Sequence, residues 1–312
     1  MSRWEKVLAG KVSSAIIATL CALLWGSAFP TLKYAYTEFG IQNDVSGRIL
    51  LAAIRFFMAS VLLFLFYIAG NHQREKSDGR LNLKTVGSLI VLGLFQTALQ
   101  YYFFYNGLAN TTGIKASVLA SSGTFFMVLV AHFVYRDDKM NRGKVIGLVT
   151  GFIGIVLVNW GKDFSWNFAL NGEGFLIFTG VVNAVGTVLA KKLSKEVNPF
   201  RISAWQMLFG SLMLLVIAFA SGHPSLNWTI FGTVLLIYSA FISAVAFGLW
   251  YSLLKYHKAG EITIFKFIVP ISGSVFSVLF IATEHFSTSI LFALFFVSIG
   301  IFSVNRNRNV KV

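Results

Sequence analysis

The sequence is poor in cysteine and in charged residues. Its single cysteine, Cys21, excludes an intrachain disulfide and any metal site built from several cysteines. Charged residues make up 12% of the 312 positions, whereas soluble proteins carry about 25%. Apolar residues make up 56%, and phenylalanine alone occurs 32 times. These proportions argue against a soluble protein and indicate an integral membrane protein.

Signatures of enzymes and of nucleic-acid binding are also missing. The chain has no HExxH motif and no glycine-rich phosphate loop after a strand. Its five histidines are far apart along the chain, and the adjacent pair Glu284–His285 lies at a span end. The net charge of +14 comes from short basic clusters between apolar runs, and not from a stripe interleaved with exposed aromatics. We therefore expect no catalytic residue, no metal, no cofactor and no nucleic-acid partner.

Ten apolar stretches are long enough, or nearly so, to cross a bilayer as helices, which takes about 17–25 residues. They predict an all-α integral membrane protein with ten transmembrane helices. The predicted spans are Val12–Tyr34, Ile49–Ala69, Val86–Asn106, Ala116–Tyr135, Val145–Trp160, Gly174–Leu193, Ile202–Ala220, Thr229–Tyr251, Ile262–Ala282 and Ile290–Val304.

The distribution of positive charge predicts the orientation. Most of the 26 lysines and arginines lie in segments that would face one side of the membrane, and the opposite segments hold Lys33, Arg48, Lys115 and Lys162. Because positive residues concentrate on the cytoplasmic side, both termini are predicted to be cytoplasmic, which fits an even number of spans. We expect a multi-pass protein of the cell membrane, in contact with the lipid bilayer; the sequence has no signature of an oligomeric state.

The chain also repeats itself. The segment Gly113–Asp137 corresponds to Gly260–Glu284, and IGIVLVN at Ile153–Asn159 resembles IGIFSVN at Ile299–Asn305. Five spans in each copy, an odd number, place the copies in opposite orientations. We predict two inverted five-helix repeats, residues 1–165 and 166–312, with a solute site at their interface near the middle of the membrane.

In these features the chain resembles the EamA-type carriers of the drug/metabolite transporter superfamily. The resemblance rests on LLWGSAFPTLKYA at Leu23–Ala35, the pair Arg55–Phe56, Gly113, and the acids Asp137 and Glu284 near the ends of the fourth and ninth spans. It implies two inverted halves around a central cavity, and the transport of amino acids or other small metabolites, usually outward. One departure is Gly123, where the family often has a proline.

Uncharged polar and aromatic residues inside the spans are candidates for the wall of a solute path. Amides and phenols that face lipid are costly, so they should face other helices or a wet cavity. The alternative is hydrogen bonding between helices, and for the tryptophans it is anchoring at the membrane interface. The candidates are Gln96, Gln100 and Tyr101 in the third span, Asn183 in the sixth, Gln206 in the seventh, and Trp25 and Trp250 in the first and eighth.

Two positive charges lie inside predicted spans. Arg55 could pair with an anionic group of a solute, or it could snorkel to the outer surface or bind backbone carbonyls. Lys266 lies near the end of the ninth span, a position that favours snorkelling; pointing inward, it would attract anions.

All twelve acids lie in loops or at span ends, which disfavours a carrier of organic cations or a proton-coupled carrier. The placement of the acids thus favours a carrier of neutral, zwitterionic or anionic small molecules that works by alternating access. The resemblance implies that these are amino acids or related metabolites and that the protein is an exporter. A lipid-handling carrier or scramblase, a membrane-embedded enzyme and a sensor remain alternatives.

Overall fold

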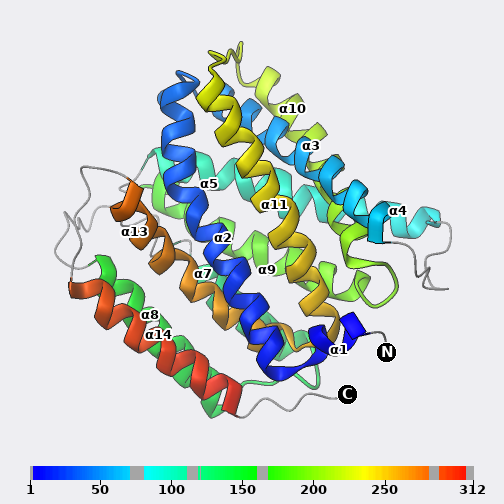
Figure 1. Ribbon diagram of the computed structural model, residues 1–312, viewed down its shortest axis with the longest axis vertical. Helices are drawn as coiled ribbons and strands as arrows, with labels where there is room; N and C mark the ends of the chain where they lie inside the picture. Colours follow the sequence, from blue (N-terminus) through cyan, green and yellow to red (C-terminus); the bar gives the residue numbers. More distant parts are fainter. Residues whose placement is uncertain are drawn as a thin grey trace.

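The computed structural model is a bundle of helices (Figure 1). It describes residues 3–70, 81–110, 119, 121–159, 168–280 and 288–306, and these contain no β-strand. The all-α prediction is therefore confirmed. Seven helical stretches are long and apolar enough to cross a membrane: Lys11–Glu38, Val45–Gly70, Leu83–Gly107, Leu170–Leu193, Pro199–Ala220, Ile230–Tyr256 and Ala259–Phe280. Two further apolar helices, Ser122–Val134 and Phe295–Val304, are shorter.

The described parts of the predicted spans are helical. The uninterrupted ones are α2 (Lys11–Glu38), α3 (Val45–Gly70), α8 (Arg142–Asn159), α10 (Pro199–Ala220), α11 (Ile230–Tyr256) and α14 (Thr288–Arg306). The sixth span begins with a π-helical turn, η2 (Leu170–Gly174), and continues as α9 (Phe175–Leu193). Of the fourth span, the helix described is α7 (Ser122–Val134). A short helix that the sequence did not predict, α1 (Arg3–Ala9), precedes the first span.

Several helices begin where the sequence supplies an N-cap. The side chain of Asn198 accepts a hydrogen bond from the Phe200 N–H at the start of α10, where Pro199 occupies the first turn. Thr229 accepts one from the Gly232 N–H at the start of α11. Such caps satisfy N–H groups that have no partner within the helix, and each typically contributes about 0.5–2 kcal/mol.

Two predicted spans are interrupted in ways that the sequence analysis did not foresee. The third consists of α4 (Leu83–Gly93), a π-helical turn η1 (Leu94–Leu99) and α5 (Gln100–Ala109). The ninth consists of α12 (Ala259–Ile262), a 3₁₀ turn η3 (Thr263–Phe267) and α13 (Ile268–Phe280). Pro270 contributes to the second break because it has no N–H to donate to the carbonyl of Lys266, four residues earlier. Both breaks lie beside candidate site residues.

The helices pack in matched sets. Extensive contacts join α3 to α10 and α8 to α14. Helix α2 contacts α11 and α13, while α9 contacts α5 and α7. Gly147 allows α8 to approach α14 closely, because a Cβ at this position would lie 3.3 Å from the carbonyl oxygen of Gly300. In Figure 1, α8 and α14 lie side by side at one edge of the bundle.

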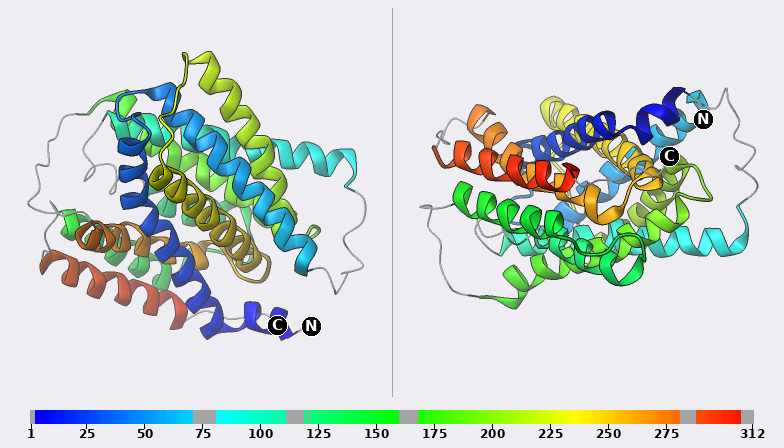
Figure 2. Two further views of the ribbon diagram at one scale, coloured as in Figure 1. Left: turned by 45° about the horizontal axis from the view of Figure 1, so that its top comes forward. Right: turned by 90° about the horizontal axis from the view of Figure 1, so that it is seen from below.

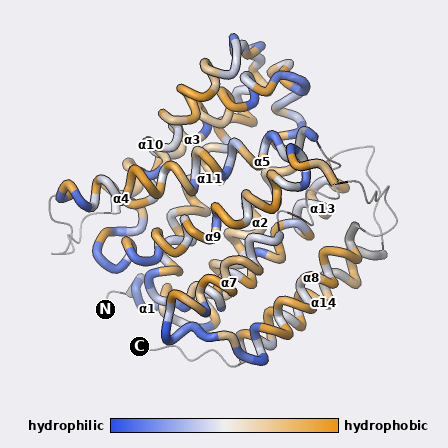
Figure 3. The backbone as a smooth tube through the Cα atoms, turned by 180° about the vertical axis from the view of Figure 1, so that it is seen from behind, coloured by the Kyte–Doolittle hydropathy of each residue, from blue (hydrophilic) through white to orange (hydrophobic). Residues whose placement is uncertain are grey.

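The outer surface suits a hydrocarbon environment. Large apolar side chains in the middle of helices are exposed, among them Phe57, Leu212 and Phe295, and hydrophilic residues gather mainly at the helix ends (Figure 3). Both described ends of the chain lie at the same end of the bundle (Figures 1 and 2), hereafter the terminal end. There α1 packs against the end of α11, where the Tyr256 hydroxyl donates to Glu5 Oε1 (3.3 Å).

Candidate functional site

Four polar side chains form a chain of hydrogen bonds inside the bundle. The Lys266 ammonium donates to Asn183 Oδ1 (3.1 Å). The Asn183 amide donates to Gln100 Oε1 (2.9 Å), and the Gln96 amide donates to the same oxygen (3.1 Å). The two glutamines come from the first half of the sequence, and Asn183 and Lys266 come from the second. The structure therefore brings together four of the predicted site residues across the two halves.

The π-helical turn η1 positions the glutamines. The backbone N–H of Gln100 donates to the carbonyl of Phe95, five residues back, as π-helical geometry requires. Gln96 and Gln100 then lie one turn apart with their amides in contact. Gly186 of α9 packs directly against the Gln96 amide, since a Cβ at Gly186 would lie 2.2 Å from Gln96 Oε1. Turns of this type are frequent at functional sites.

Two tryptophans enclose the ammonium of Lys266. Its Nζ lies 5.5 Å from the ring centroid of Trp25 and 5.2 Å from that of Trp250. The two indoles are 5.2 Å apart at an interplanar angle of 61°. Both contacts are within the range of cation–π attraction. Lys266 thus points into the bundle and does not snorkel, contrary to the interpretation that its position near a span end favoured.

The residues around Lys266 are partly exposed, and two nearby polar atoms have no hydrogen-bond partner among the described residues. Trp25, Gln100, Asn183 and Lys266 are half-buried although each contacts residues of other helices. The indole nitrogen of Trp250 and Oε1 of Gln96 are buried and have no hydrogen-bond partner among the described residues. Unpaired buried polar atoms are costly. The site therefore holds one donor and one acceptor whose hydrogen-bonding capacity is unused among the described residues.

Arg55 lies deeper along its helix than the predicted span, which began at Ile49, would place it. Helix α3 begins at Val45, so Arg55 is about 15 Å along its axis. The side chain is 3% exposed, its Nε donates to the Ser243 hydroxyl (3.0 Å), and its guanidinium lies 5.3 Å from the Phe56 ring. It does not reach the surface. Arg55 is a positive charge held at mid-depth by uncharged groups.

Aromatic residues connect Arg55 with the lysine site. Tyr101 packs against Phe56 at 4.4 Å between ring centroids. Phe247 lies 5.4 Å from Trp25 and 5.9 Å from Tyr251. The hydroxyl of Tyr251 is buried and has no hydrogen-bond partner among the described residues. Sequence reasoning missed Ser243 and Phe247, because a serine and a phenylalanine in an apolar span carry no distinctive signal.

Gln206 lies apart from this site. It is fully buried in α10, and its Oε1 accepts a hydrogen bond from the Thr97 hydroxyl (2.8 Å). The backbones approach closely here, since a Cβ at Gly93 would lie 2.7 Å from the carbonyl oxygen of Gln206. The contact ties α10 to η1 and so supports Gln96 from behind.

At the terminal end, buried charges join α7, α8 and α12. Asp138, just after α7, forms an ion pair with Lys144 of α8, and each side chain is 1% exposed. Asp138 Oδ2 also accepts a hydrogen bond from the Gly260 N–H (2.8 Å). The resemblance singled out the neighbouring Asp137, but that residue is exposed. Lys115, Gly113 and Glu284 lie outside the described residues.

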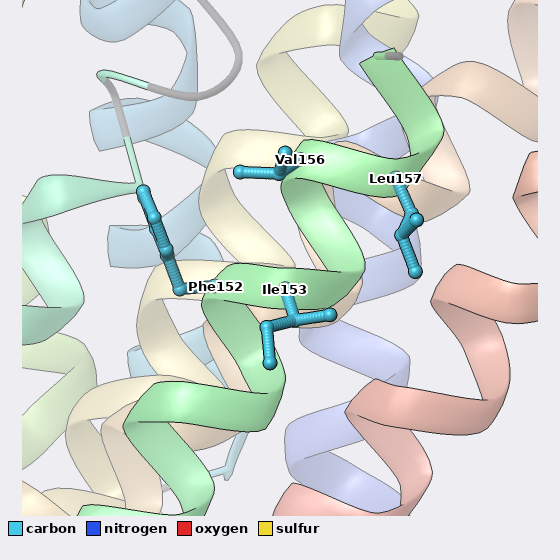
Figure 4. Close-up of a pocket in the computed structure, with 4 residues that line it drawn as sticks. All are labelled: Phe152, Ile153, Val156 and Leu157. Atoms are coloured by element: carbon cyan, nitrogen blue, oxygen red, sulfur yellow. The ribbon is translucent and has the colours of Figure 1, made fainter.

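A shallow apolar groove on α8 is a poor candidate for a solute site. It is lined by Phe152, Ile153, Val156 and Leu157 (Figure 4). Phe152 and Ile153 are exposed on the outside of the bundle. The four side chains provide no polar group to orient a solute.

Adding one methyl group at Gly186 should disturb the glutamine pair. In a Gly186→Ala variant, the new Cβ would displace the Gln96 amide, the movable end of a side chain, and break its hydrogen bond to Gln100. We expect transport by the purified, reconstituted protein to fall about tenfold, the effect of about 1.4 kcal/mol. The melting temperature should change little. Unchanged transport would show that the position of Gln96 does not matter.

The chain is similar to known transporters over most of its length. The profile of the EamA-like transporter family matches residues 12–160 and 170–306. A Synechocystis protein named as an uncharacterized transporter is 26% identical over 306 residues, covering 93% of this chain and 88% of its own length. The Bacillus subtilis protein named uncharacterized transporter YoaV is 26% identical over 296 residues, covering 94% and 96%. One solved crystal structure has the same fold, with a TM-score of 0.74 at 18% identity, covering 93% of this chain and 96% of that one.

Proposed function

The chain belongs to the EamA-like transporter family and is a multi-pass membrane transporter, and from this premise we propose that it carries small metabolites through a path between its two halves. The observation that carries the proposal is the hydrogen-bonded chain of Gln96, Gln100, Asn183 and Lys266 beside Trp25 and Trp250. An apolar wall with a few convergent polar groups is the usual form of a small-molecule site. Amino acids and related neutral, zwitterionic or anionic solutes fit these groups.

The proposed architecture is ten transmembrane helices in two inverted repeats, residues 1–165 and 166–312. Its support is the matched packing: α3 with α10 and α8 with α14 pair corresponding spans of the two halves. The contacts of α2 with α11 and α13 correspond to those of α9 with α5 and α7. The two matches to the family profile also fall on either side of residue 165.

In the proposed mechanism the two halves rock and open the site to each side in turn. The tie between Asp138, Lys144 and Gly260 closes the terminal end by joining the end of α7 to the start of α12. With most positive residues at the cytoplasm, the terminal end is the cytoplasmic one and the membrane is the cell membrane. Transport is proposed to run outward.

Reconstitution in liposomes tests the proposal. Uptake of labelled amino acids, organic acids and nucleosides is screened first, and the best solute is used for variants. Gln100→Ala and Tyr101→Ala should each lower transport about tenfold or more, because Gln100 accepts both bonds of the amide chain and Tyr101 lines the aromatic connection to Arg55.

The matched control is Ser88→Ala in α4, whose exposed hydroxyl bonds its own helix at Lys84 O (3.1 Å). It should transport at the wild-type rate. The proposal fails if no solute moves, or if both site variants equal the wild type. Movement of fluorescent lipid between leaflets without solute uptake would favour a scramblase instead.

A further inference from the structure

In the part of the chain that the structure describes, neither Arg55 nor Lys266 has a carboxylate partner. Among the described residues, ion pairs join Lys144 to Asp138 and Lys258 to Glu261, and neither involves Arg55 or Lys266. Arg55 and Lys266 contact the hydroxyls of a serine and a tyrosine, an asparagine amide and aromatic rings. A charge removed from water is costly unless it is paired.

Other buried lysines show how the fold neutralises a charge that serves structure. Lys144 has the carboxylate of Asp138 and also donates to the carbonyl oxygens of Asp138 (3.0 Å) and Lys139 (2.8 Å). Lys191 donates to the carbonyl oxygens of Leu254 and His257. Lys266, with three donors, has one amide oxygen. Its surroundings differ from those of a structural lysine.

The two charges lie at different depths of one path. The partner of Arg55 is Ser243, and one of the rings around Lys266 is Trp250, seven residues further along α11. At 1.5 Å of rise per residue this is about 10 Å along the helix axis. Lys266 is the nearer of the two to the terminal end, because α11 ends there. One carboxylate cannot contact both charges at once.

Aromatic side chains lie between the two charges. Tyr101 follows Gln100 in α5 and packs on Phe56, beside Arg55. Tyr251 follows Trp250 in α11 and has a buried hydroxyl without a hydrogen-bond partner among the described residues. Phenol hydroxyls can donate to an anion, and the ring faces offer an apolar wall.

We propose that the solute is a small organic anion bearing a carboxylate, which binds first at Lys266 and then at Arg55 on its outward passage. This inference rests on the proposed function. The mobile carboxylate supplies the negative charge that no described residue places beside either cation. A neutral or cationic solute would leave both charges unpaired, so it should be carried poorly.

The test uses probe pairs of nearly equal shape: benzoate with benzamide, lactate with lactamide, and succinate with succinamide. Uptake of each labelled compound is measured in liposomes that contain the full chain. We expect at least one carboxylate to be taken up about tenfold or more faster than its amide, the loss expected for one hydrogen bond to a charged group. Equal rates for every pair would overturn the inference, while uptake itself would leave the proposed function standing.

Variants show which residues distinguish a carboxylate from its amide. Lys266→Met and Arg55→Gln should each lower the ratio of carboxylate uptake to amide uptake about tenfold or more, and Arg55→Lys should restore part of that ratio. Lys84→Met, at an exposed lysine of α4, is the matched control and should behave as the wild type. If both site variants lower carboxylate and amide uptake equally, the cations act on structure and the inference is wrong.

A further arm separates the solute's own carboxylate from a bound inorganic anion. Chloride is replaced by gluconate on both sides of the membrane. Unchanged carboxylate uptake supports the inference. Loss of uptake without chloride, together with chloride flux that depends on Arg55, would show that an inorganic anion neutralises the cations, and would overturn it.

Discussion

Replacing Asp138 by alanine should lower the free energy of unfolding by about 3–5 kcal/mol, the effect of removing one partner of a buried ion pair. The variant leaves the ammonium of Lys144 buried without its carboxylate, and it leaves the Gly260 N–H without its acceptor. The measurement is thermal or denaturant unfolding of the purified protein in detergent.

Two variants make this expectation specific. Asp137→Ala removes the adjacent acid, which is exposed, and should change stability by less than about 0.5 kcal/mol. The double variant Asp138→Ala/Lys144→Met removes the orphaned charge together with its partner and should regain part of the lost stability. A double variant as unstable as Asp138→Ala would contradict the role assigned to the ion pair.

Replacing Gly93 by alanine should separate two helices and abolish most transport. The new Cβ would lie 2.7 Å from the carbonyl oxygen of Gln206 and 3.0 Å from the backbone nitrogen of Gly210, so the backbone of α10 would have to move. Overpacking of this kind costs about 1–3 kcal/mol. The displaced segment includes Gln96, three residues further along the chain, so we expect transport in liposomes to fall by more than tenfold.

Gly87→Ala is the matched control. It makes the same chemical change six residues earlier in α4, where nothing lies within 4 Å of the added Cβ. Because alanine favours a helix over glycine, this variant should be as stable as the wild type or more stable by about 0.5–1 kcal/mol. If Gly93→Ala matched it in both stability and transport, the close approach of α4 and α10 at Gly93 would have no part in shaping the site.

The sequence predicted the helices well because apolar length is a strong and local signal. Spans such as Ile49–Ala69 and Ile202–Ala220 lie within α3 and α10 with small differences at their ends. The breaks at η1 and η3 were missed. A proline such as Pro270 favours a bend in a helix. The type of turn, however, depends on which neighbouring groups bond to the freed backbone carbonyls, and the packing of the helices determines those neighbours.

The sequence shows the type of each polar residue within a span but not the direction in which its side chain faces. Gln100 and Gln206 are both amides within apolar spans, yet one joins the lysine site and the other is fully buried against Thr97. Lys266 and Lys144 are both lysines near span ends, yet one has only an amide oxygen and the other has a carboxylate. Neither difference has a signal in the spacing of the residues along the chain.

The sequence alone therefore determined that this protein crosses a membrane with helices, which family it resembles, and roughly how deep each polar group lies. The tertiary structure decided which way each polar group faces and with which groups it forms hydrogen bonds or ion pairs. The physical reason is that a transmembrane helix is apolar on nearly every side, because lipid and protein neighbours are equally apolar. The inner face is then defined by the helices that pack around it.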